Sequence, residues 1–139
     1  MYFKLVLLLL ILEVYLTTQE VACDIRISPQ SASEGDNVTI TCSYCCYSRF
    51  KGPRFMILIQ NRNGERHEVA VNRFIQNKFR RMGRFEADIF LNNTTEYVQE
   101  ITITDVEMRD VGTYECFGYF RDSPRATQHK QGSLTVSRT

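Results

Sequence analysis

The sequence contains no tryptophan, only two histidines and no apolar run long enough to cross a bilayer. Its longest apolar run, residues 5–12, stops well short of the roughly 20 residues that a membrane helix needs. His67 and His129 both lie in expected turns or loops, and no nucleophile elbow, phosphate-binding loop or paired-carboxylate motif accompanies either one. We therefore expect two solvated surface histidines, no catalytic residue and no enzyme.

Internal repeats, low-complexity tracts, heptads and a convincing helical period are also missing. The formal net charge of +1 lacks the strong positive balance of a nucleic-acid-binding protein. The cysteine-rich stretch "CSYCC" (residues 42–46) is not followed by a second CxxC motif or by a histidine pair that would complete four zinc ligands. We expect no nucleic-acid partner, no cofactor and no metal site.

The N-terminus has the form of a signal peptide. A lysine precedes the apolar run at residues 5–12, and a polar stretch leads from there to Cys23. Cleavage after Cys23 would place small side chains at the processing positions, so residues 1–23 are the expected signal peptide and residues 24–139 the expected mature domain. The chain should be secreted or lie on the extracellular face of the plasma membrane, and attachment to the membrane would need a segment beyond this chain.

Three sequons, at Asn37, Asn92 and Asn93, have the Asn-x-Ser/Thr pattern of N-glycosylation. Such triplets are common by chance, so they support the assignment to the secretory pathway without establishing it. We predict glycans at these positions.

What the mature chain does contain is short runs rich in Val, Ile, Thr, Tyr and Phe, separated by turn residues at intervals of about ten. Strands are expected at residues 36–44, 54–60, 83–91, 97–106, 112–120 and 132–137, with shorter ones near residues 25–27 and 68–71. In the first of these, apolar and polar residues alternate, as in a strand that is buried on one face. This spacing is typical of an all-β antiparallel sandwich.

The stretch "DVGTYEC", which ends at Cys116, has the alternation of a strand. Tyr114 and Cys116 point to the same side because residues two apart share a face. Cys42 lies on the inward face of its own strand, so a disulfide between Cys42 and Cys116 would join two sheets across the core. The hydroxyl of Tyr114 can bond back to the chain near Asp110, which is the arrangement called a tyrosine corner.

The stretches "EGDNVTITC", "ITITDVEMRDVGTYEC" and "GSLTV" resemble an immunoglobulin variable-type (V-set) domain over essentially the whole mature chain. The resemblance implies an immunoglobulin-like Greek-key β-sandwich of the V type, with a salt bridge between Arg84 and Asp110. The family's core tryptophan is absent, and Ile57 is expected in its place before Gln60. The glycine-rich bulge of the last strand is reduced to "QGSLTV".

V-set domains bind through the sheet that carries strands G, F, C and C′, or through the loops at its end. If Ile57 and Cys116 face inward, period-two counting predicts an outer ligand-binding face. Its expected members are Met56, Leu58, Gln60, Phe117 and Tyr119. The alternative is that the loop at residues 120–131 covers this apolar patch.

Two further features stay open. Cys45 and Cys46 could form a strained bond with each other, an additional intrachain bond or an interchain bond, and we hypothesise a disulfide-linked dimer. The basic stretch "NRFIQNKFRRMGR" carries Arg73, Lys78, Arg80, Arg81 and Arg84. It could meet an anionic glycan or an acidic partner, or it could be a solvated loop.

These features predict a secreted or cell-surface recognition module that binds a protein ligand or receptor in immune recognition or adhesion. One alternative is a self-associating adhesion or structural module that forms a homodimer. An enzyme or metal protein is the alternative from a third class.

Overall fold

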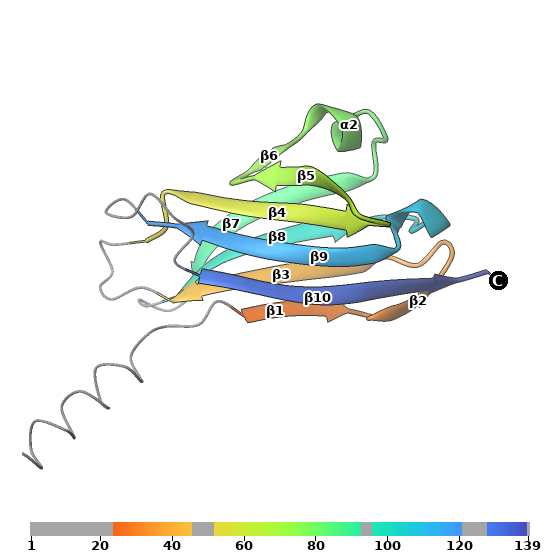
Figure 1. Cartoon of the computed structure of the whole chain (residues 1–139), viewed down its shortest axis with the longest axis horizontal. Helices are drawn as coiled ribbons and strands as arrows, with labels where there is room; N and C mark the ends of the chain where they lie inside the picture. Colours follow the sequence, from red (N-terminus) through yellow and green to blue (C-terminus); the bar gives the residue numbers. More distant parts are fainter. Residues whose placement is uncertain (1–23, 46–51, 93–95, 121–127, 139) are drawn as a thin grey trace, which may run out of the picture.

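The computed structural model describes residues 24–45, 52–92, 96–120 and 128–138. The expected signal peptide therefore lies outside the described residues. Strands of two sheets form two layers that pack face to face (Figure 1). The four-stranded sheet contains, in order, β1 (Asp24–Ser28), β3 (Val38–Cys45), β8 (Glu96–Ile103) and β7 (Phe85–Asn92). The six-stranded sheet contains β2 (Ser31–Ser33), β10 (Gln128–Ser137), β9 (Gly112–Tyr119), β4 (Phe55–Arg62), β5 (Glu65–Val71) and β6 (Phe74–Ile75).

This arrangement confirms the predicted sandwich and the predicted strands. The pairing of β4 with β5 and of β5 with β6 supplies the additional strands that mark the variable type. Sequence reasoning missed the short strand β2, which pairs in parallel with β10. It also missed the helices α2 (Asn77–Arg80) and η1 (Met108–Asp110), because elements of three or four residues are too short to show a helical period.

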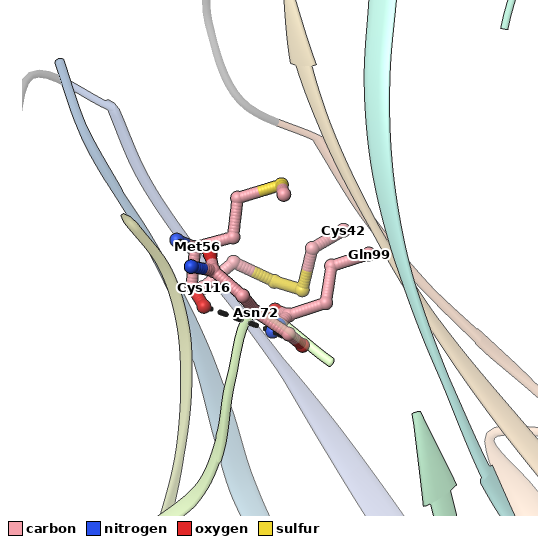
Figure 2. The surroundings of a disulfide bond; sticks show 5 residues. All are labelled: Cys42, Met56, Asn72, Gln99 and Cys116. Carbon is pink, nitrogen blue, oxygen red and sulfur yellow. Dashed lines mark hydrogen bonds between the residues drawn. A yellow bond between two sulfur atoms is a disulfide. The ribbon is translucent and has the colours of Figure 1, made fainter. Parts of the chain in front are cut away.

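The core lies between the sheets and follows the alternation of the strands. On β3, Val38, Ile40 and Cys42 are fully buried, while Thr39 and Thr41 on the other face are partly exposed. A disulfide joins Cys42 to Cys116 of β9 with a Cα–Cα distance of 6.0 Å (Figure 2). The predicted bond across the two sheets is confirmed.

A buried glutamine crosses the core beside this disulfide. Gln99 lies next to Cys42 in the register of β3 and β8, and its side chain reaches the opposite sheet (Figure 2). Its Nε2 donates hydrogen bonds to the carbonyl oxygen of Met56 at 2.9 Å and to that of Asn72 at 3.0 Å. A polar link between the layers thus lies in the region where the family's tryptophan would pack.

The tyrosine corner is present as predicted. The Tyr114 hydroxyl donates to the carbonyl oxygen of Asp110 at 2.5 Å, and it accepts a hydrogen bond from Gln60 Nε2 at 3.3 Å. Arg84 Nη1 lies 2.6 Å from one carboxylate oxygen of Asp110, which confirms the expected salt bridge. Burial raises the pKa of the Tyr114 hydroxyl well above its usual value, and the nearby Asp110 carboxylate adds to this increase.

The raised pKa of Tyr114 predicts a loss of stability in alkaline solution. The unfolded chain releases the phenolic proton near pH 10 while the folded chain keeps it, so stability falls as the pH rises above about 10, by at most about 1.4 kcal/mol per pH unit. The variant Tyr114→Phe should lack this contribution and should lose about 1 kcal/mol at pH 7 with the corner hydrogen bond. Urea unfolding of both proteins between pH 7 and 11 tests this, and parallel pH profiles would contradict it.

Candidate binding face

The outer face of the six-stranded sheet is the candidate site, and the register of β4 decides its composition. Met56, Leu58 and Gln60 are 2%, 0% and 5% exposed, so they face the core. Ile57 and Ile59 alternate with them and lie on the outer face. The predicted orientation of this strand was therefore wrong for all three expected binding residues and for Ile57.

The error has a physical reason. Every position from Phe55 to Ile59 is apolar, so the sequence alternation carries no information about which set is buried. Matching Ile57 to the family's tryptophan predicts that Ile57 faces the core. In the structure, Leu58 is the residue opposite Cys116, and it takes the inward place two residues before Gln60.

This corrected orientation can be tested by truncation. Leu58→Ala removes a fully buried side chain next to the disulfide and should lower the free energy of unfolding by about 3 kcal/mol. Ile57→Ala on the outer face should cost no more than about 1 kcal/mol. Chemical denaturation of the two variants measures the difference, and a larger effect at Ile57 would restore the original orientation.

Strand β9 presents the residues expected of it. Phe117 and Tyr119 alternate with the buried Tyr114 and Cys116, so they lie on the outer face together with Glu115. Phe117 pairs with Ile57 in the register of β4 and β9. The outer face therefore keeps an apolar character, although β4 contributes different side chains from those predicted.

One line of residues crosses five strands of this face. The cross-strand partners, from β6 to β9, are Phe74, Val71, Ile57 and Phe117, which we call the apolar row. Phe74 at its outer end is 74% exposed. At the other end, His129 of β10 stacks on Phe117 with ring centroids 4.3 Å apart. Phe55 and Tyr119 form a second cross-strand pair beside the row.

A charged group adjoins the apolar row. Glu115 has little exposed surface although it points outward, because Arg66 and His129 flank its carboxylate. Arg66 Nη2 lies 2.9 Å from Glu115 Oε2, and the Arg66 guanidinium also lies 5.7 Å from the centroid of the Phe117 ring. His129 Nε2 lies 3.6 Å from Glu115 Oε1. The centre of the face therefore combines a stacked aromatic ring with an internally compensated ion pair.

The basic stretch does not form one continuous cationic surface. Arg84 is largely buried against Asp110, and Arg73 donates to the carbonyl oxygen of Ile89 at 3.3 Å. Arg80 and Arg81 donate to Asn77 at the start of the short helix α2. These contacts disperse the charges, and Lys78 faces a cavity that is described below.

The predicted additional disulfide and the predicted glycans can be placed only in part. Cys46, Asn93 and the side chain of Cys45 lie outside the described residues, so the proposed additional disulfide stays a prediction. Asn37 and Asn92 are exposed and belong to the four-stranded sheet or its immediate connection. Glycans at these two positions would leave the outer face of the six-stranded sheet uncovered.

Within the described ranges, no helix has both the length and the apolar character required to cross a membrane. In the same part of the chain, three or more potential metal-ligating side chains do not gather at any point.

The immunoglobulin V-set domain family model matches residues 27–137. The chain therefore belongs to the V-set immunoglobulin domains, in agreement with its sheet order and its disulfide. Domains of this family are in general extracellular recognition or adhesion modules that bind other proteins, and they are in general not enzymes. A comparison with curated proteins found no match.

Proposed function

We propose that this domain binds a protein ligand through the outer face of its six-stranded sheet, as a secreted or cell-surface module of immune recognition or adhesion. The observation that carries the proposal is the apolar row, which runs across β6, β5, β4 and β9 on a face that no other described element covers. Phe74 is exposed and the other three members of the row are partly exposed. Contiguous accessible apolar surface is characteristic of interaction sites, and aromatic residues are enriched at interface centres.

Two features support this choice of face. The rings of Phe117 and His129 stack, and Arg66 and Glu115 form an ion pair, so the side chains are held in one arrangement before a partner binds. A preorganised face loses less conformational entropy on association. The predicted glycans at Asn37 and Asn92 belong to the other sheet and would not block access.

The matched substitutions Phe55→Asp and Phe90→Asp test the proposal. Both phenylalanines are 41% exposed, but Phe55 lies on the candidate face beside the apolar row and Phe90 lies on β7 of the other sheet. The multimerised domain can be screened against individually displayed cell-surface proteins. With the ligand so found, Phe55→Asp should weaken binding at least about tenfold because it places an unpaired charge in an apolar interface, and Phe90→Asp should have little effect.

The outcomes separate the alternatives. Equal binding by the wild type and Phe55→Asp would overturn the proposed face, and so would an equal loss in Phe90→Asp. Sedimentation velocity on the same proteins addresses the homodimer, because a dimer that Phe55→Asp dissociates would identify a second copy of the chain as the occupant.

A further inference from the structure

A cavity of about 380 Å³ lies at the end of the sandwich where the β4–β5 hairpin, α2 and η1 meet. Its lining combines residues from all three segments, and η1 is distant in the sequence from the other two. Gln60 and His67, which are cross-strand partners on the core side of β4 and β5, contribute to the wall. The cavity is therefore separate from the outer face that carries the apolar row.

Two cations of this cavity have no carboxylate partner within the described part of the chain. Arg62, the last residue of β4, and Lys78 of α2 both line it, and neither forms a salt bridge with another described residue. Lys78 lies 5.9 Å from the centroid of the Phe79 ring. Arg109 also lines the cavity, but its Nε lies 2.5 Å from Glu107 Oε2. Arg62 and Lys78 thus leave uncompensated positive charge at the cavity.

The acidic residues of the lining do not cancel this charge. Asp110 is buried, and both of its carboxylate oxygens are bound by Arg84. The side chain of Glu65 is mostly exposed, and it lies 3.4 Å from His67. One acid is therefore already neutralised, and the other supplies a single negative charge against the two positive charges of Arg62 and Lys78.

We propose that this cavity binds an acidic saccharide, whose carboxylate or sulfate would lie between Arg62 and Lys78. A volume of this size lies near the lower end of the range for small-ligand sites and suits about one sugar residue. Met82 and Phe79 supply an apolar wall for a sugar ring. An extended peptide would need a groove or a free sheet edge, whereas this cavity is bounded by the β4–β5 hairpin, α2 and η1.

Titration of the full chain with defined probes tests the inference. The probes are 3′-sialyllactose, a sulfated disaccharide, the corresponding uncharged saccharides and a glutamate-rich peptide, with binding followed by amide chemical shifts. Either charged saccharide, or both, should perturb the amides of residues 60–67 and 77–82. Arg62→Gln and Lys78→Gln should each raise the Kd about tenfold, the loss expected for one charge-assisted contact.

Arg80→Gln is the matched control. Arg80 lies on α2 with Lys78 and carries the same charge, but it donates to Asn77 and does not line the cavity. Its substitution should change the Kd less than about twofold if the contact is local and not a general effect of net charge. The carboxylate and sulfate probes identify which anionic group is preferred.

Four outcomes would overturn the inference. They are equal affinity for uncharged saccharides, equal losses in Arg80→Gln and Lys78→Gln, binding of the acidic peptide alone, and no binding of any probe. Phe55→Asp should leave saccharide binding unchanged, so failure of this inference and failure of the proposed protein-binding face are distinguishable.

Discussion

The double substitution Cys42→Ala, Cys116→Ala is expected to lower the free energy of unfolding by about 5 kcal/mol. The disulfide joins residues 74 positions apart, and closing a loop of that length in the unfolded chain removes conformational entropy equivalent to about 4.5 kcal/mol at 25 °C. Both cysteines are fully buried between the sheets, so the alanines also lose packing contacts. Urea unfolding of the wild type and the variant under oxidising conditions measures the difference.

Reducing agent provides the control for this prediction. Added reductant should destabilise the wild type by a similar amount and should leave the alanine variant nearly unchanged, because the variant has already lost this bond. Equal stability of the two oxidised proteins would show that packing, and not the covalent link, holds the sheets together. Comparable sensitivity of the variant to reductant would show that a disulfide elsewhere carries much of the effect.

The sequence was most informative where polar and apolar residues alternate. On β3 the threonines alternate with Val38, Ile40 and Cys42, so the inward set could be read directly. On β9, Tyr114 and Cys116 are two residues apart, so both could be assigned to the inward face. The hydrogen bond from Tyr114 to Asp110 followed from the spacing of the corner. Each of these predictions rests on contacts whose geometry is dictated by the period of a strand.

Strand β4 shows where such reasoning fails. Both faces of this strand carry apolar residues, so the sequence does not show which face is buried. The answer depends on which other elements pack against each face. Neighbouring strands settle the question: Leu58 lies opposite Cys116, while Ile57 lies between Phe117 and Val71. Gln99 was equally unpredictable, because its partners are main-chain carbonyls of β4 and of the turn that follows β5.

The candidate sites also depend on contacts between separate strands and helices, which the sequence does not show. The apolar row takes one residue from each of four strands, and three of its members, Ile57, Val71 and Phe74, were not among the predicted binding residues. The acidic-saccharide cavity needs α2, whose four residues are too short to produce a recognisable pattern. The sequence identified the basic stretch, but in the fold Lys78 of that stretch lines the cavity together with Arg62, which comes from β4.

Strand β9 places alternate residues in the core and on the proposed binding face. Tyr114 and Cys116 face inward and fix the strand through a hydrogen bond and a disulfide. Glu115 and Phe117, which alternate with them, present an ion pair and an aromatic ring to the outside. We expect the rigidity of the inward set to limit the entropy that the outer face loses on binding.

The substitution Arg84→Met is the second change with a large expected effect, a loss of about 3 to 5 kcal/mol in the free energy of unfolding. The Arg84 and Asp110 side chains are 10% and 2% exposed, so the carboxylate would remain buried without its counter-ion. The main-chain amide of Glu107 would still donate to it at 2.8 Å, but one neutral hydrogen bond does not compensate a buried charge. Thermal and urea unfolding at pH 7 measure the loss.

Arg66→Met is the matched control, because Arg66 also lies 2.9 Å from a carboxylate but its side chain is 51% exposed. Water screens that pair, so the expected cost is at most about 1 kcal/mol. The double variant Arg84→Met, Asp110→Leu removes the buried charge together with its partner and should be more stable than Arg84→Met alone. Its two substitutions should therefore couple by about 2 kcal/mol or more in a double-mutant cycle. Additive effects, or equal losses at Arg66 and Arg84, would mean that the corner is held by its tyrosine and its main chain, and that the ion pair contributes little.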